Sequence, residues 1–228
     1  MACDWMGMGS NNKRDQIMAA GARVFARLGY HSATVEDVIR EAGVARATFY
    51  SNFSDKRDLF TAVATGITDD IVNRVVQGID AIAGPDGTTE KRRLRVPEFE
   101  ERLSELIDGI ARYVRRNRGI ARVFLHEMVG VDREMTRLFY EFQERLIDQF
   151  ERLVDYGVHV GMFRETERRT AAEFIVSGHM YLARSFSAGV GSYDVEEMAH
   201  RFMDLQLKGL LVKTGVAPAG RERVKARG

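Results

Sequence analysis

Residues 34–53 read TVEDVIREAGVARATFYSNF, a pattern that predicts two short helices separated by a tight turn. Thr34 precedes the first helix, where a hydroxyl can accept free backbone N–H groups and acidic side chains in the first turn complement the helix dipole. Gly43 suits the left-handed geometry at the end of that helix, and the second is expected to begin near Arg46. Two short helices joined at residues 42–44 are the ingredients of a helix-turn-helix.

The second short helix, at about residues 46–53, is too polar on one side to be an ordinary core helix. The side chains expected to face outward are Arg46, Thr48, Ser51 and Asn52. Arginine can donate twice to guanine, asparagine can pair with adenine, and a threonine methyl can contact thymine. Tyr50 and Lys56 flank this face, where a hydroxyl and an ammonium can bind phosphates. The pattern therefore favours a helix that lies in the major groove of DNA.

The flanking sequence supplies further helices. Apolar residues recur at helical spacing between Lys13 and Leu28, so a helix is expected there to pack against the two short ones. Ser54 is expected to cap a long helix that reaches about Ala83, with Asp55 in its first turn. The segment after it, residues 84–89, is rich in glycine and threonine and predicts a loop.

The remainder of the chain predicts a second helical body. Five more helices are expected. The first has Pro97 in its first position, the second is shorter and lies around residues 120–127, and the third begins after Asp132. The fourth is capped by Thr166 and ends near Ala188, and the last runs from Asp194 to Val212. No segment shows a convincing strand period. The sequence therefore predicts an all-α fold.

In this register, the N-terminal region resembles the DNA-binding domain of the TetR family of transcriptional regulators. The positions that carry the resemblance, all between residues 14 and 60, are Ala22-Arg23-Val24-Phe25, Gly29-Tyr30, Thr34-Val35, Ala42-Gly43-Val44, Thr48-Phe49-Tyr50, Phe53, Lys56 and Leu59-Phe60. The resemblance implies a homodimer with about nine helices in each subunit, usually a repressor. It also implies that a small, mostly hydrophobic molecule enters the C-terminal body and releases a palindromic operator.

The resemblance implies the domain organisation as well. Residues 11–71 would form the N-terminal three-helix DNA-binding domain, with the helix-turn-helix at 34–53. Residues 72–214 would form a larger C-terminal helical domain for ligand binding and dimerisation. Residues 1–10 and 215–228 are expected to be a flexible arm and a flexible tail.

The candidate site residues fall into two groups, of which the first is carried over from the resemblance and the second is chosen from the bulky apolar and the polar side chains of the C-terminal helices. The DNA-binding candidates are Thr34, Arg46, Ala47, Thr48, Tyr50, Ser51, Asn52 and Lys56. The candidates for the ligand pocket are Phe124, Glu127, Met128, Phe139, Phe142, His179 and Tyr181. Dimerisation is expected through the last two helices. Ala45 departs from the family, which often has a hydroxyl residue there, and the missing cap costs about 1 kcal/mol.

Composition sets limits on other functions. The 34 basic and 33 acidic residues exclude a bulk polycation, so contact with DNA must be local. The single cysteine excludes an internal disulfide and every multi-cysteine zinc site, and it suits a reducing cytoplasm. No apolar run approaches the roughly 20 residues of a membrane span, and residues 1–10 do not resemble a secretory signal.

Two alternatives stay open. One is an all-helical enzyme or metal-binding bundle, because Glu197 and His200 have the Glu-x-x-His spacing of a di-iron site, although such sites need two copies. No catalytic motif, metal site or cofactor is expected. The other is an activator or a general DNA binder that responds to no ligand.

Overall fold

The structure is a computed structural model that describes residues 12–85, 94–190 and 194–211. Nine helices account for most of these residues: α1 (Lys13–Leu28), α2 (Val35–Ala42), α3 (Arg46–Tyr50), α4 (Lys56–Ala83), α5 (Val96–Arg116), α6 (Arg118–Glu127), α7 (Arg133–His159), α8 (Arg168–Ala188) and α9 (Val195–Leu210). Among the described residues, the only strand-type pairing is an isolated bridge between Phe163 and Leu211. The all-α prediction is confirmed. The predicted arm and tail lie outside the described residues, as does part of the loop after α4.

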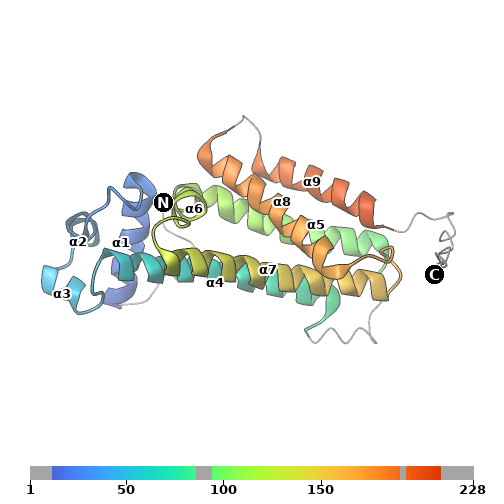
Figure 1. Cartoon of the computed structure of the whole chain (residues 1–228), viewed down its shortest axis with the longest axis horizontal. Helices are drawn as coiled ribbons and strands as arrows, with labels where there is room; N and C mark the ends of the chain where they lie inside the picture. Colours follow the sequence, from blue (N-terminus) through green and yellow to red (C-terminus); the bar gives the residue numbers. More distant parts are fainter. Residues whose placement is uncertain (1–11, 86–93, 191–193, 212–228) are drawn as a thin grey trace, which may run out of the picture.

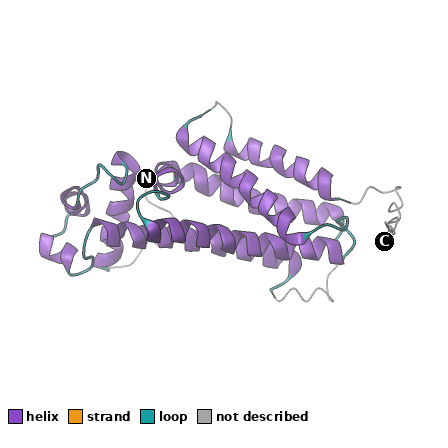
Figure 2. Cartoon of the chain, viewed as in Figure 1, coloured by secondary structure: helices purple, strands orange, loops and turns teal. Residues whose placement is uncertain are grey.

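The helices form a small bundle and a larger one that share α4. Figure 1 shows α1, α2 and α3 gathered at one end of the molecule, and α4 and α7 running side by side along its length. In the larger bundle α7 packs against α4 and α8, while α5 packs against α4 and α9. Helix α6 packs against both α1 and α8, so it lies between the two bundles. Helix dominates the described residues, with short connecting turns (Figure 2).

The small bundle is held together by aromatic side chains. Phe25 of α1 and Phe60 of α4 pack edge to face with their ring centroids 5.2 Å apart. Phe49 and Phe53 are fully buried in the same core. Each buried phenylalanine contributes roughly 1.5–3 kcal/mol relative to an exposed one. This aromatic core fixes the orientation of α3, which has only five residues.

Helix α2 has the caps that the sequence predicted. The Thr34 side chain accepts the backbone N–H of Asp37, and the Asp37 carboxylate accepts the N–H of Thr34, which completes a capping box. Hydrogen bonds from Thr34 lower the pKa of Asp37. Gly43 ends the helix at φ 62° and ψ 38°, the left-handed region. Ala45 provides no side-chain cap for α3, as expected.

Two predicted caps are wrong by one residue. Asp55, not Ser54, caps α4, because its carboxylate accepts the N–H of Asp58 at 2.8 Å, while the Ser54 backbone N–H donates to the Asp58 side chain. Likewise Glu167, not Thr166, caps α8, because its carboxylate accepts two backbone N–H groups of the first turn. In both cases a carboxylate one residue later supplies the acceptor that the sequence assigned to a hydroxyl.

Smaller boundary differences concern α5 and α9. Helix α5 begins at Val96, so Pro97 is its second residue rather than its first. Both positions tolerate proline because their N–H groups have no partner within the helix. The last helix ends at Leu210, before the predicted end at Val212, which lies outside the described residues.

We expect Gly43→Ala to lower the free energy of unfolding by about 1–2 kcal/mol, because an L-residue is strained in the left-handed region. Gly109→Ala is the matched control. Gly109 lies inside α5, where an added Cβ meets nothing within 4 Å, so alanine should stabilise the protein by about 0.5–1 kcal/mol. Urea unfolding measures both changes, and equal effects of the two variants would contradict the left-handed turn.

Candidate functional site

Helix α3 projects from the end of the small bundle. It buries Phe49 and leaves Arg46, Ala47 and Tyr50 exposed, together with Ser51 directly after it. Figure 1 shows α3 at the extremity of the molecule, with no other described helix in front of it. An exposed helix of this length, held by a buried aromatic anchor, can enter the major groove of a DNA duplex.

Among the described residues, Arg46 forms an ion pair with Glu36. Its Nη1 lies 2.9 Å from Oε1 of Glu36 on α2, and its guanidinium lies 5.5 Å from the centre of the Tyr50 ring. Both charged side chains are more than half exposed. Exposed ion pairs contribute only about 0–1 kcal/mol, so the pair with Glu36 is a weak competitor for a guanine.

Three other DNA-binding candidates, Thr48, Ser51 and Asn52, form hydrogen bonds with one another at the end of α3. The Asn52 side-chain amide and the Ser51 hydroxyl both donate to the Thr48 carbonyl, at 2.8 and 2.9 Å. Arg14 of α1 donates to the Asn52 carbonyl at 2.9 Å and lies over the Phe53 ring. The free protein therefore directs the Asn52 amide donor toward its own backbone, and pairing with adenine requires a change of rotamer.

Lys56 has a different environment from the one expected of a phosphate ligand. Its ammonium donates to the carbonyl oxygens of Tyr30, His31 and Ala33, at 2.8, 3.2 and 2.8 Å. Burial lowers the pKa of this ammonium. An ammonium has three N–H donors, and here each has a protein acceptor. Lys56 thus joins the start of α4 to the segment between α1 and α2.

Two more DNA-binding candidates, Thr34 and Tyr50, differ in how free their hydroxyl groups are to bind DNA. The Thr34 hydroxyl donates to the Asp37 carboxylate at 2.6 Å, so it serves the cap of α2. The Tyr50 side chain is 46 % exposed and lies on the outer face of α3.

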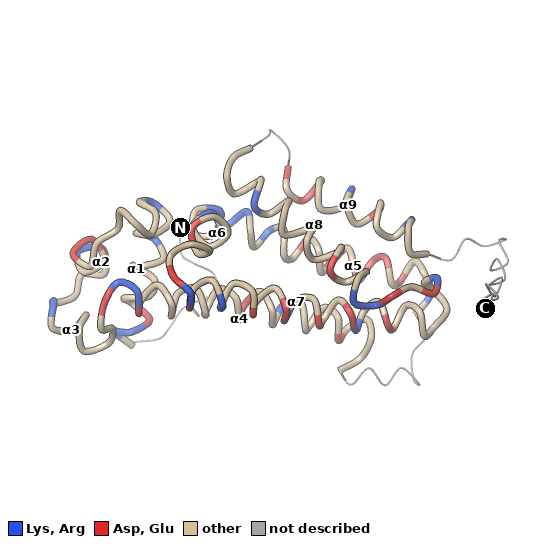
Figure 3. The backbone as a smooth tube through the Cα atoms, in the orientation of Figure 1, with Lys and Arg blue, Asp and Glu red and all other residues tan. Residues whose placement is uncertain are grey.

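Basic and acidic residues are interspersed along α4 and α7, whereas α3 carries Arg46 and no acidic residue (Figure 3). Positive charge at the tip of the small bundle is thus local, as the sequence suggested.

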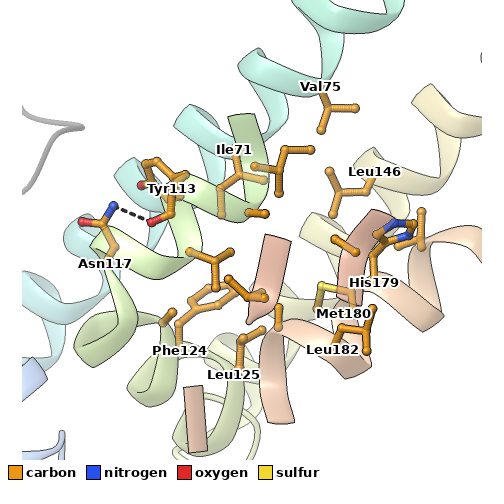
Figure 4. Close-up of a pocket in the computed structure, with 18 of the residues that line it drawn as sticks. Ile71, Val75, Tyr113, Asn117, Phe124, Leu125, Leu146, His179, Met180 and Leu182 are labelled. Atoms are coloured by element: carbon orange, nitrogen blue, oxygen red, sulfur yellow. Dashed lines mark hydrogen bonds between the residues drawn. The ribbon is translucent and has the colours of Figure 1, made fainter. Parts of the chain in front are cut away.

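A cavity of about 110 Å³ lies in the larger bundle. A single water needs roughly 10–15 Å³, so this space has room for a small organic molecule or part of one. Of the predicted pocket residues, Phe124, Phe142 and His179 line it. Most other lining side chains are aliphatic, including Ile71, Val75, Leu125, Leu146 and Leu182 (Figure 4).

Three polar side chains lie among the lining residues. Asn117 donates to the Tyr113 carbonyl at 2.9 Å, and the Tyr113 ring faces the Arg74 guanidinium. Figure 4 shows Tyr113 and Asn117 on one side of the cavity and His179 on the opposite side. None of the described lining residues is charged. The cavity therefore suits an apolar molecule with few polar groups.

Four predicted pocket residues lie elsewhere. Met128 and Phe139 are buried in the core without lining the cavity, and Tyr181 is 69 % exposed on the outer face of α8. Glu127, at the end of α6, accepts the backbone N–H of Tyr30 at 2.8 Å. The sequence shows that these residues are large or polar and helical, but it does not show which neighbours each one meets.

Several polar contacts join the bundles. Besides the bond between Glu127 and Tyr30, Arg57 in the first turn of α4 pairs with Asp132 and Glu134 at the start of α7, both at 2.5 Å. The hydrogen bond from Arg57 lowers the pKa of Asp132 to about 2. Sequence reasoning missed Arg57, because its partners are more than 70 residues away.

The outer faces of α8 and α9 expose large apolar side chains. Phe174 is 75 % exposed, Tyr181 lies seven residues later on the same side of α8, and Leu205 of α9 is 68 % exposed. The two helices approach closely, because a Cβ on Gly178 would overlap the Phe202 ring. Exposed apolar groups collected on one face are typical of a protein interface.

The structure gives no support to the Glu-x-x-His spacing as a metal site. His200 bonds to Asp108 at 2.6 Å, and Glu197 pairs with Arg201. Across residues 12–85, 94–190 and 194–211, no group of three or more potential metal ligands gathers. In the same ranges, none of the helices combines the length and apolar character that crossing a bilayer requires.

The small bundle and its exposed α3 define a helix-turn-helix protein, and comparison with known proteins identifies its family. The pattern of bacterial regulatory proteins of the tetR family matches residues 17–63. The pattern described as "Tetracyclin repressor-like, C-terminal domain" matches residues 97–210, half of the chain. The chain belongs to the TetR family of transcriptional regulators.

Individual relatives share a third or less of their aligned residues with this chain. The transcriptional activator FasR of Mycolicibacterium smegmatis is 32% identical over 85 residues, which cover 37% of this chain and 36% of FasR. The transcriptional repressor KstR2 of Rhodococcus jostii is 22% identical over 207 residues, which cover 89% of this chain and 93% of KstR2. The chain thus spans about a third of FasR but nearly all of KstR2.

Solved structures show the same fold. The fatty acid degradation regulator FadR from Bacillus halodurans superimposes with a TM-score of 0.72 at 22% identity, over 88% of this chain and 97% of that one. FadR from Bacillus subtilis, solved in complex with stearoyl-CoA, superimposes with a TM-score of 0.68 at 20% identity, over 85% and 97% of the two chains.

We expect Lys56→Met to lower the free energy of unfolding by about 1–3 kcal/mol, because three carbonyl groups lose their donor. The salt dependence of DNA binding should not change, since the ammonium is engaged within the protein. Lys13→Met is the control, because Lys13 is exposed and donates to the Gln16 side chain of its own helix. A log–log salt slope that falls by about one in Lys56→Met would show instead that this ammonium binds a phosphate.

Proposed function

We propose that this protein is a ligand-responsive repressor that binds a palindromic operator as a homodimer. The observation that carries the proposal is the exposure of Arg46, Ala47, Tyr50 and Ser51 on a short helix whose buried side, Phe49, is anchored in an aromatic core. Such a helix presents its N-terminal residues to base edges while neighbouring groups bind the backbone.

Residue roles follow from this placement. Arg46 is the candidate for a guanine, the Ala47 and Thr48 methyl groups for thymine, and Asn52 for adenine after its amide leaves the Thr48 carbonyl. Ser51 is a further candidate for a base edge, and Tyr50 presents a hydroxyl for a phosphate oxygen. Thr34 and Lys56 support the scaffold through the contacts described above. Thr34 is also exposed at the start of α2, where it can contact the DNA backbone.

The homodimer is proposed to form through α8 and α9. Phe174, Tyr181 and Leu205 supply an exposed apolar surface, and burial of such area is the main driving force for stable association. A two-fold dimer places two α3 helices on one duplex about one helical turn apart, roughly 34 Å, and the palindrome mirrors this symmetry.

The ligand is proposed to occupy the apolar cavity of the larger bundle. An unfilled apolar cavity is costly, so a molecule that fills it stabilises the conformation in which the cavity has that shape. Helices α4 and α6 each contribute lining residues and also pack against α1, so a shift of either helix changes the spacing of the two α3 helices. A structural neighbour solved with stearoyl-CoA, whose acyl chain is apolar, supports a ligand with a long apolar part.

Repression is favoured over activation because the similarity to a repressor covers more of the chain than the similarity to an activator. The similarity to the repressor KstR2 extends over most of both chains, whereas the similarity to the activator FasR covers about a third of each. The sign of regulation can be read from in vitro transcription of a promoter that carries the operator.

We expect Arg46→Ala to weaken operator binding by about 1–3 kcal/mol and to relax the preference at one base position. The operator is first selected from fragments of the source genome, and affinities are then measured on that sequence and its single-base variants. Arg137→Ala on α7, which removes an exposed arginine paired with Glu141, should leave affinity unchanged. An equal loss on all base variants would show that Arg46 contacts only the DNA backbone.

Phe174→Glu is expected to convert the dimer to a monomer, because a charge would be buried at the centre of the proposed interface. Operator affinity should fall at the same time, since two linked helices bind far more tightly than one. Tyr140→Glu is the matched control, because Tyr140 is exposed to a comparable degree but lies on α7. Light scattering gives the mass of each variant, and a Phe174→Glu protein that remains dimeric would exclude this surface.

A further inference from the structure

His179 lies where two cavities of the larger bundle meet. The cavity described above and a smaller neighbour, of about 20 Å³, share three lining residues, Ile107, Phe150 and His179. The neighbour is lined mainly by apolar side chains of α5, α7 and α9, including Leu103, Leu153 and Leu207. A ligand that extends through both spaces therefore passes the imidazole ring of His179.

The hydrogen bonds of His179 define its chemical character. Its Nδ1 lies 2.9 Å from the carbonyl oxygen of Ile175, one turn earlier on α8. A carbonyl only accepts, so Nδ1 carries the proton and Nε2 of the neutral ring offers a lone pair. Burial lowers the pKa of His179, which keeps the ring neutral. The Phe202 ring packs nearly perpendicular to the imidazole at 5.1 Å and helps to hold its orientation.

The Nε2 atom has no protein partner within the part of the chain that the structure describes, and it is shielded from solvent. A buried acceptor without a donor has lost its hydrogen bond to water without compensation, so a molecule that supplies the donor gains affinity there. Buried unsatisfied groups are rare in proteins, and those in a cavity are candidates for ligand recognition.

We propose that the effector is an extended apolar molecule with a neutral hydroxyl group that donates a hydrogen bond to Nε2 of His179. This inference rests on the proposed function, because it assigns the chemistry of the ligand to the same cavity. The hydroxyl lies at the junction of the two cavities, and the apolar part fills the larger one.

The lining excludes the charged counterparts of such a molecule. A carboxylate would bring two acceptors next to the lone pair of His179, and none of the described lining residues is a cation that could compensate. An ammonium could donate to Nε2, but the described lining contains no carboxylate to offset its desolvation. A hydrocarbon fills the space but leaves Nε2 without a donor. A neutral hydroxyl meets both requirements.

Three ten-carbon probes test this inference on the full-length protein: decanol, its isomer methyl nonyl ether, and decanoate at neutral pH. The ether has the same atoms as the alcohol but no donor. Calorimetric titration gives each Kd, and an operator-binding titration with each probe shows whether the DNA is released. We expect decanol to bind about tenfold more tightly than the ether, and decanoate to bind more weakly than decanol.

Two substitutions assign the preference to His179. His179→Leu removes the acceptor and should make the alcohol and the ether bind equally, whereas His179→Gln retains an acceptor and should keep part of the preference. Thermal unfolding checks that both variants fold. Binding of the ether to His179→Leu shows directly that the cavity is intact.

The possible results separate this inference from the proposed function. Equal binding of alcohol and ether to the unaltered protein, a preference for the alcohol that survives in His179→Leu, or tighter binding of decanoate would overturn the hydroxyl assignment alone. Binding of decanol through His179 without release of the operator would overturn regulation by this cavity and leave the assignment intact. No binding of any probe would count against both.

Discussion

The burial of Phe49 and Phe53 is the constraint on which the proposed DNA contact depends. A helix of five residues is far below the length at which an isolated helix is stable in water, so α3 exists only because its inner side is held in the core of the small bundle. The same anchoring determines which side chains face outward. Arg46, Tyr50 and Ser51 are presented at the end of the molecule as a consequence of what lies beneath them.

The orientation of the small bundle relative to the larger one depends on a few specific contacts. Helix α4 is common to both, Glu127 accepts the backbone N–H of Tyr30, and Arg57 pairs with the start of α7. Because α6 carries both Glu127 and residues that line the cavity, a displacement there changes the support of α1 directly. This arrangement gives a physical route by which an occupied cavity could alter DNA binding, as a difference in ligand affinity between two conformations.

The cavity and the surface of α3 differ in the kind of selectivity that they offer. The cavity is mostly apolar, so we infer that its size and the unpartnered acceptor of its lining, Nε2 of His179, set what it admits. The proposed DNA-binding face is polar, and some of its groups already bond to their own backbone or to Glu36. If this face binds DNA as proposed, binding breaks these weak internal contacts, which favours DNA sequences that replace each of them with a good hydrogen bond.

The sequence by itself determined the helices and the helix-turn-helix, because caps, glycine turns and apolar periodicity act within a few residues. The bounds of α1 and α2 and the role of Asp132 were all predicted correctly. The tertiary structure alone decided which long-range partners the polar side chains meet. Lys56 donates to three carbonyls, Glu127 accepts the N–H of Tyr30, and Tyr181 faces outward. Each of these contacts depends on how helices that are distant in the sequence pack together.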